Sequence, residues 1–294
     1  MTDQQTNYNA KTLLLIAIGV VVACMIIPFG ALLIYPFRLF GTFVHETAHA
    51  LAAVLTGGEV VGMSVNWDTS GLTLSRGGSR FFTASAGYLG SMVVGAGLLV
   101  AGRRPQWAKP TLIVLGAATL LAMAFFGGYG SALLPMLGFG LGIALIAFGR
   151  LKGHRDDVPE AKLIAAGALA IALSFAYLAF SGGLLTWAIG LAVGGAFLAV
   201  GLLGSRVLAH ATVLFTAVTL SLDGLESLKQ LVSLNMLGHG HNDAATLATL
   251  TGVPATLWAF VWSVSALLLV GAALWIFWRD EKRQSNQKAF ATKK

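Results

Sequence analysis

The chain has 294 residues, of which 56% are hydrophobic and 11% are charged. A soluble domain carries about a quarter of its residues as charges, so this composition excludes an ordinary soluble domain and indicates a membrane protein. The net charge is +7, and the charged residues lie mainly between the apolar runs and in the C-terminal tail. No basic face of a soluble domain is visible, which argues against nucleic-acid binding and leaves the lipid bilayer as the expected surroundings.

The apolar runs predict up to nine membrane-spanning helices. Crossing hydrocarbon takes about 20 residues, and a backbone exposed to lipid must satisfy its own hydrogen bonds. The alternating ten-residue strands of a membrane barrel are absent. The predicted spans are 12–35, 38–56, 81–101, 111–126, 131–149, 163–181, 183–203, 206–232 and 255–278. Short breaks separate two pairs, so we expect an all-α membrane protein, a polytopic helical bundle of about seven to nine spans.

These spans form one multi-span domain, residues 12–278, between a polar N-terminal tail, 1–11, and a basic C-terminal tail, 279–294. The first apolar run continues without a small-residue cleavage signal, so it is interpreted as a retained span. The basic loops at 103–109 and 150–162 and the basic tail are expected in the cytoplasm. With nine spans, that rule puts the N-terminus outside.

Residues 57–80 interrupt the apolar pattern directly after the second run. Val60 to Trp67 and Leu72 to Leu74 alternate between apolar and polar residues around the turn 68–71. This alternation predicts a membrane-associated β-hairpin. A plain connecting loop is the alternative.

His45, Glu46 and His49 form the pattern HETAH inside an apolar run. Residues four apart lie on one face of a helix, so the two imidazoles can bind one zinc ion. Zinc lowers the pKa of bound water to about 7, and Glu46 can act as the general base toward that water. Ionisable groups are costly in a span unless they pair or bind something, which favours a functional site.

A catalytic zinc needs a third protein ligand, and Asp223 is the preferred candidate. It lies in a nearly uncharged span, where an unpaired carboxylate is expensive. Asp243 is the alternative ligand, in a segment where His239 and His241 could also hold a second metal.

Purely structural roles are also possible for these groups. The two histidines of the motif could hydrogen-bond across helices while Glu46 pairs with Arg38, and Asp223 could pair with Lys229. His210 is interpreted as an interhelical hydrogen-bonding residue. The single cysteine, Cys24, is expected to be packing.

The motifs together resemble the site-2 protease family of intramembrane zinc metalloproteases, and its compact bacterial branch most closely. The similarity covers residues 38–90 and 220–262. The matching segments are His45–Ala50, Thr56–Gly58, Gly87–Gly90, Leu222–Gly224, Asp243–Ala245 and Val253–Trp258. An Asn and a Pro that better-known members carry around the LDG segment are missing here.

This resemblance implies one zinc ion per chain held by His45, His49 and Asp223, with Glu46 as the base. It implies a transmembrane protein as the substrate, whose unwound helix is presented to the zinc by strand addition to the hairpin. The resemblance to bacterial members implies a bacterial cytoplasmic membrane. The predicted function is intramembrane peptide hydrolysis.

Two other functions use the same sequence features. A transporter or channel could use the His, Glu and Asp side chains as a cation site, but 163–203 offers no further acidic or histidine residue. A non-catalytic membrane scaffold could retain the fold without the chemistry, but the intact HETAH motif argues against it.

Overall fold

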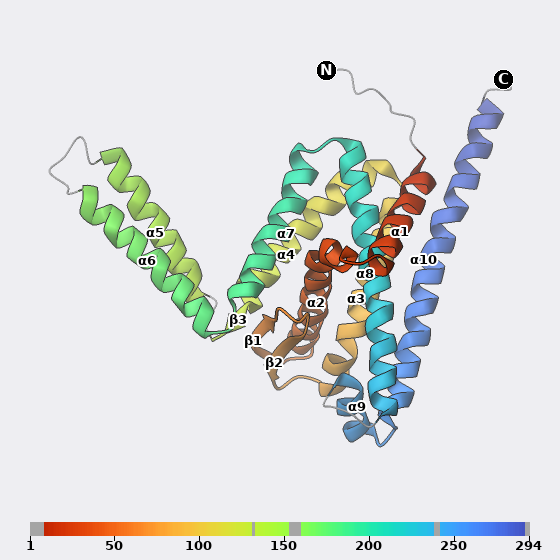
Figure 1. The fold of residues 1–294 in the computed structure, drawn as a ribbon, viewed down its shortest axis with the longest axis horizontal. Helices are drawn as coiled ribbons and strands as arrows, with labels where there is room; N and C mark the ends of the chain where they lie inside the picture. The colour runs from red at the N-terminus through yellow and green to blue at the C-terminus, as the bar shows by residue number, and fades with distance from the viewer. Residues whose placement is uncertain (1–8, 131–132, 153–159, 238–241, 292–294) are drawn as a thin grey trace.

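A computed structural model describes residues 9–130, 133–152, 160–237 and 242–291 (Figure 1). The elements, in chain order, are α1 (Ala10–Ile26), α2 (Gly30–Leu55), β1 (Glu59–Val65), β2 (Gly71–Arg76), α3 (Arg80–Gly102), a 3-10 turn (Pro105–Trp107), α4 (Ala108–Phe126), β3 (Gly128–Tyr129), α5 (Leu133–Lys152), α6 (Glu160–Phe180), α7 (Leu184–Leu203), α8 (Arg206–Met236), α9 (Asp243–Thr251) and α10 (Ala255–Ala291). Within the described residues, seven helices are long and apolar enough to cross a membrane: α3 to α8 and α10. The prediction of a polytopic helical membrane protein is confirmed.

The first two helices differ from the prediction. A break at residues 27–29 bends α1 against α2 by 112°, so the expected continuous span 12–35 is wrong. Pro28 lacks an N–H and disfavours a helical conformation at the residue before it, and Ile27 is accordingly extended. Phe29 then takes a left-handed φ of 64° at the start of α2. The bent pair can add one crossing at most, which gives seven or eight in the described chain; the predicted orientation depends on that parity and stays a prediction.

The predicted β-hairpin is confirmed. β1 and β2 pair antiparallel, and the turn is closed by a hydrogen bond from Asn66 N to Ser70 O at 2.8 Å. Asp68 supports the turn by accepting hydrogen bonds from the backbone N–H and the hydroxyl of Ser70. Tyr129, in the short strand β3, adds to the far side of β1, giving the strand order β2-β1-β3. One edge of β2 is therefore left without a strand partner in the described sheet.

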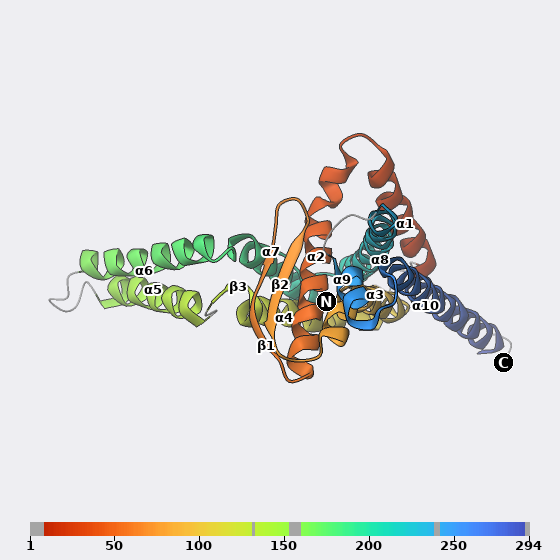
Figure 2. The same ribbon diagram turned by 90° about the horizontal axis from the view of Figure 1, so that it is seen from below.

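The hairpin lies between α2 and α7. On one side the Thr42 hydroxyl, in α2, donates to the Thr69 carbonyl at 2.7 Å. On the other side the Val65 N–H donates to the Thr186 hydroxyl, in α7, at 2.9 Å. Seen from below, the hairpin runs along α2 (Figure 2). These contacts fix β2 over the face of α2 that carries the HETAH motif.

Helices α4 and α7 pack closely through glycines. A Cβ added to Gly116 would lie 2.7 Å from the carbonyl oxygen of Gly194, and one added to Gly190 would meet Met123. Small residues allow such close approach of helices in membranes. Gly190 and Gly194 are therefore helix-packing residues.

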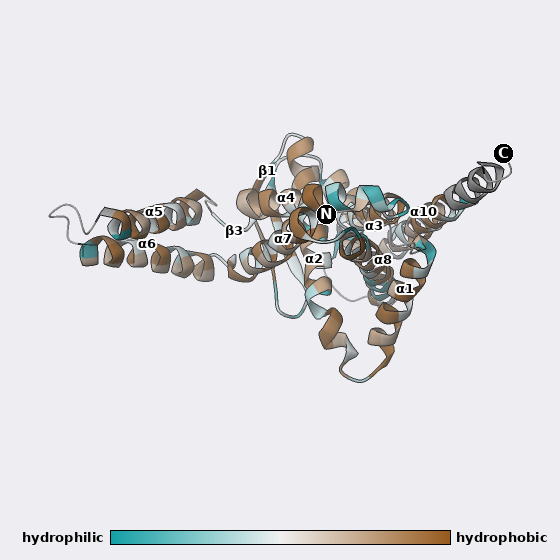
Figure 3. Ribbon diagram, turned by 90° about the horizontal axis from the view of Figure 1, so that it is seen from above, coloured by the Kyte–Doolittle hydropathy of each residue, from teal (hydrophilic) through white to brown (hydrophobic). Residues whose placement is uncertain are grey.

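Helices α5 and α6 pack on each other and extend away from the other helices (Figure 1). Their residues are hydrophobic along most of the length of both helices and hydrophilic at the outer ends (Figure 3). At that outer end Arg150 lies 3.6 Å from the carboxylate of Glu160. This distribution fits a helical pair that contacts lipid.

Two other side chains behave as predicted. His210 is completely buried, and its Nε2 donates to the Gly102 carbonyl at 2.5 Å, which joins α8 to α3. Cys24 is buried in α1.

Replacing Gly116 by Ala is expected to push α4 away from α7, because backbone atoms of the facing helix occupy the space of the new methyl group. We expect the free energy of unfolding to fall by about 1–3 kcal/mol, measured by thermal or denaturant unfolding in detergent. Gly195→Ala is the matched control, since nothing lies within 4 Å of a Cβ built there. Equal stability of the two variants would contradict this packing.

Candidate metal centre

The two histidines of α2 lie one turn apart on the same helix face. Their Nε2 atoms are 3.0 Å apart, and the ring centroids are 4.7 Å apart. His49 is buried, at 7% exposure, and Glu46 beside it at 5%. The spacing of four residues therefore converges two imidazole nitrogens on one point, as the sequence predicts.

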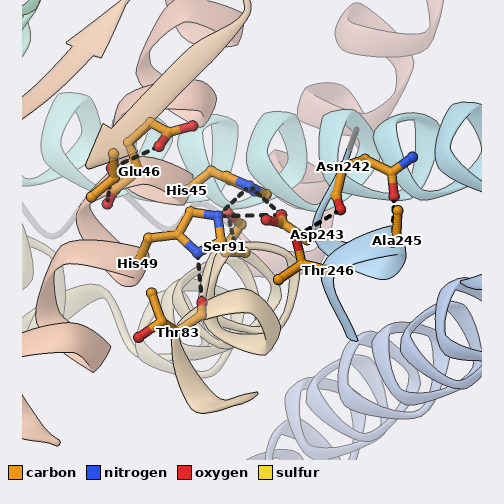
Figure 4. A network of polar contacts seen from close by, with 11 residues as sticks. His45, Glu46, His49, Thr83, Ser91, Asn242, Asp243, Ala245 and Thr246 are labelled. Atoms are coloured by element: carbon orange, nitrogen blue, oxygen red, sulfur yellow. Dashed lines mark hydrogen bonds and ion pairs between the residues drawn. The ribbon is translucent and has the colours of Figure 1, made fainter. Parts of the chain in front are cut away.

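Asp243 approaches the same point from the far end of the chain. It is the first residue of α9, which begins there because the Asn242 side chain caps the helix by accepting from Ala245 N at 2.9 Å. The Oδ2 atom of Asp243 lies 3.4 Å from Nε2 of His45 and 3.3 Å from Nε2 of His49. Figure 4 shows the three side chains pointing toward one another.

The three ligand atoms fit a metal ion. Their mutual distances are 3.0, 3.3 and 3.4 Å. Tetrahedral zinc with bonds of about 2.0–2.1 Å separates its ligand atoms by about 3.3 Å. Two imidazoles and one carboxylate also leave one of four positions for water, the ligand count of a catalytic rather than a structural zinc site.

Helix α3 supports the two histidines. Nδ1 of His49 donates to the Thr83 carbonyl at 2.6 Å, which orients the ring so that its Nε2 faces His45 and Asp243. Tyr88 packs edge-on against the His45 ring, with centroids 4.6 Å apart, and stacks on Trp262 of α10. A Cβ on Gly87 would collide with both Nε2 atoms. The segment Gly87–Gly90 thus lies directly beside the histidines.

The surroundings of Asp243 favour its ionised form. Burial alone raises the pKa of this carboxyl, but the hydrogen bonds and positive charge of His45 and His49 hold the pKa well below its usual value. A deprotonated carboxylate is the form that can bind a metal.

The preference for Asp223 as the third ligand does not agree with this arrangement. The structure places Asp223 against Arg38, with Oδ1 3.0 Å from Nε, and outside the group formed by the histidines and Asp243. The cost of a carboxylate in a span is met by this ion pair between α8 and α2. Asp243, the alternative ligand, takes the position expected for Asp223.

The structural alternatives are met only in part. His49 does hydrogen-bond across helices, to Thr83 of α3 and to Asp243 of α9, but the two expected ion pairs are not formed. Arg38 pairs with Asp223 rather than with Glu46, and Lys229 pairs with Glu226 at 3.3 Å. The proposed second metal involved His239 and His241, which lie outside the described residues.

Glu46 lies next to the histidines but faces β2. Its Oε2 accepts a hydrogen bond from the Thr73 hydroxyl at 2.7 Å, and its carbonyl accepts from the same hydroxyl at 3.0 Å. The carboxylate packs against Gly71, where a Cβ would overlap it. The hairpin therefore fixes the position of Glu46 beside the three ligand atoms without making it one of them.

A cavity of about 700 Å³ is lined by the two histidines and by the ionisable side chains around them, Arg38, Glu46, Asp223 and Asp243. The free-edge strand β2 forms one wall, and residues of α3, α8 and α9 form the others. The cavity extends along α2 from Arg38 to His49. It is large enough for several residues of an extended peptide.

The sequence interpretation missed two contributors to this site, Thr73 and Thr83, and assigned a third, Arg38, to the wrong partner. Thr73 orients Glu46, the Thr83 carbonyl orients His49, and Arg38 neutralises Asp223. The position of Thr73 between Leu72 and Leu74 in an alternating strand placed its side chain on the opposite face from the leucines, which was the one available signal. The role of the Thr83 backbone carbonyl could not be predicted from the sequence, because every residue has such a carbonyl.

The fold and the site define a multi-pass helical membrane protein with a His, His, Asp group that could hold a metal ion. The sequence profile of the Peptidase M50B-like family matches residues 13–155 and 157–273, so the chain belongs to this peptidase family. The predicted site-2 protease-like resemblance is confirmed at this level. Comparison with curated proteins and with solved structures gives no match.

Substituting Gly87 by Ala is expected to displace both imidazoles and weaken metal binding, because the methyl group would occupy the space of the two Nε2 atoms. Bound zinc per chain after dialysis measures the effect. Gly97→Ala, in the same helix with open space around its Cβ, is the control and should keep the metal content of the wild type. If Gly87→Ala binds zinc as the wild type does, the imidazoles do not meet at the predicted point.

Proposed function

We propose that the protein is an intramembrane zinc metalloprotease that hydrolyses peptide bonds of membrane-spanning substrates. His45, His49 and Asp243 hold the zinc ion, and Glu46 is the general base. Membership of the Peptidase M50B-like family supports the reaction class. The resemblance to bacterial members supports a bacterial cytoplasmic membrane as the location.

The observation that carries this proposal is the triangle of ligand atoms. Its edges of 3.0 to 3.4 Å match a tetrahedral zinc site, and one coordination position is left for water. When bound, zinc supplies a water molecule of lowered pKa and polarises the substrate carbonyl. A structural zinc would call for four protein ligands.

Glu46 is the candidate general base because it directly follows His45 in α2. It is buried beside His45 and His49, and Thr73 holds its carboxylate through a short hydrogen bond. Burial keeps bulk solvent from competing for its proton transfers. Glu46 accepts the proton of the attacking water and delivers it to the leaving amine.

The free edge of β2 suits an extended substrate. A transmembrane helix hides its carbonyls in internal hydrogen bonds, so it must unwind before its peptide bond can be attacked. An unwound segment can recover backbone hydrogen bonds by pairing with β2. The strand carries Thr73, the contact of Glu46, so a peptide paired there lies across the metal centre.

The choice of third ligand is testable by zinc content. Asp243→Asn is expected to bind zinc at least about 100-fold more weakly than the wild type, because the neutral amide is a poor ligand. Asp223→Asn is the matched control and should retain zinc, since its side chain contacts Arg38. The opposite pattern, with zinc lost only in Asp223→Asn, would restore Asp223 as the ligand.

The reaction is testable by separating metal binding from turnover. Glu46→Gln is expected to retain zinc and to cleave about 100-fold to 10,000-fold more slowly, because the general base is removed and the ligands are not. His45→Ala should lose both zinc and cleavage. The measurement is cleavage of a panel of single-span membrane proteins reconstituted with the enzyme in liposomes.

Two results would contradict the proposal. Cleavage by Glu46→Gln at the rate of the wild type would remove Glu46 from the chemistry. A zinc-loaded wild type that cleaves none of the panel would favour the non-catalytic scaffold.

A further inference from the structure

Arg38 lies on the face of α2 that carries the metal ligands. It precedes His45 by seven residues, or two helical turns, and lines the same cavity. Thr42, between them on this face, hydrogen-bonds the hairpin turn at Thr69, and the Tyr35 hydroxyl bonds the carbonyl of Trp67. Arg38 therefore lies beneath the turn end of the hairpin, where a peptide running along β2 would leave the strand.

Among the described residues, one side chain, that of Asp223, orients the guanidinium of Arg38. Its Nε lies 3.0 Å from Oδ1 of Asp223, and the Asp223 side chain packs over Gly41, where a Cβ would lie 2.8 Å from Oδ2. Within the described chain, no other hydrogen bond or ion pair of this guanidinium is found, so the N–H groups on its two terminal nitrogens have no protein partner. The side chain is 34% exposed.

An arginine held in this way is prepared to bind an anion. The guanidinium presents donors in a rigid planar fork, which matches the two oxygens of a carboxylate. Asp223 fixes the fork without occupying its outer donors. If the only role of this ion pair were to hold α2 against α8, it would add little stability. The free energy lost in removing two charges from water is about as large as the attraction between them.

The spacing along α2 sets the distance from the metal centre. Seven helical residues advance about 10.5 Å, and an extended peptide covers that distance in about three residues. Both strand pairs of the described sheet are antiparallel. Antiparallel addition to β2 points the C-terminal side of the peptide toward the hairpin turn and Arg38, because β2 runs from the turn past Glu46.

We propose that Arg38 is a substrate-binding residue that recognises a carboxylate about three residues to the C-terminal side of the scissile bond. The substrate class is an extended segment with an acidic side chain, or a chain end, at that position. Asp223 is the positioning residue for Arg38. This inference rests on the proposed function, which supplies the scissile bond, but the binding step can be measured without turnover.

The binding experiment uses the full-length Glu46→Gln protein in detergent. The probes are fluorescent ten-residue peptides rich in Val and Thr, amidated at the C-terminus, with one central Glu or with Gln in its place. We expect the Glu peptide to bind about tenfold more tightly by fluorescence anisotropy, the effect of one charge-assisted contact. A third peptide, with Gln and a free C-terminal carboxylate, distinguishes a chain end from a side chain.

Arg38→Gln in the same background should reduce that ratio to about one. Arg80→Gln is the matched control: it removes an equal charge from an exposed residue that lines the same cavity, and it should keep the preference. Asp223→Asn should reduce the preference in part, because Arg38 loses its orientation. Equal binding of the Glu and Gln peptides, or a preference that survives Arg38→Gln, would overturn the proposal.

Cleavage mapping gives the position of the carboxylate. The wild-type enzyme is given a peptide library, and the cut sites are identified by mass spectrometry. We expect Asp and Glu to be enriched two to four residues after the cut, and the enrichment to disappear in Arg38→Gln. Cleavage without this enrichment overturns the role of Arg38 and leaves the protease intact, whereas absence of all cleavage with carboxylate binding retained overturns the protease alone.

Discussion

The carboxylate of Asp243 contacts the imidazoles of both His45 and His49, and this contact joins a helix near the start of the chain to a short helix near its end. The contact depends on where α9 packs. Ala244 and Leu247 of α9 are buried in an apolar cluster with residues of α3, α8 and α10, including Trp262. Apolar packing of α9 thus places Asp243 next to the histidines.

Three elements surround the histidine pair, and each has a different part in the site. Helix α3 orients His49 through the Thr83 carbonyl and leaves space at Gly87. Strand β2 holds Glu46 through Thr73. Helix α9 contributes Asp243. The proposed base and two of the proposed metal ligands lie on one helix, and the hairpin and the last third of the chain close around that helix to complete the candidate site.

A second ionic contact shapes the other end of the cavity. Arg38 and Asp223 satisfy each other between α2 and α8, so neither charge is left alone in a largely apolar bundle. Because the pair uses only one edge of the guanidinium, it leaves hydrogen-bonding capacity facing the cavity. The Arg38–Asp223 pair thus avoids an isolated charge and still leaves a polar group at the wall of the cavity.

Much of this arrangement could be predicted from the sequence. The length and composition of the apolar runs predicted the spans from α3 onward, and the alternation of apolar and polar residues predicted the hairpin. The spacing of four residues predicted that His45 and His49 lie together. These features are local, because each depends on residues close in the chain. The bend at Pro28 was also visible in principle, since proline interrupts helices, but the uninterrupted apolar run favoured one span.

The third ligand could not be obtained in the same way. Asp223 lies in a predicted span and Asp243 lies between two spans, and the sequence does not say which cation or imidazole each one meets. The preference for Asp223 assumed that it had no counter-ion, whereas Arg38 provides one from another helix. Such pairings depend on tertiary packing between segments far apart in sequence.

Anomalous scattering at the zinc edge, from crystals of the zinc-loaded protein, tests the central claim most directly. The account predicts one strong peak per chain within about 2.0–2.2 Å of His45 Nε2, His49 Nε2 and a carboxylate oxygen of Asp243. A peak bound by Asp223 instead, or no peak at the two histidines, would contradict it.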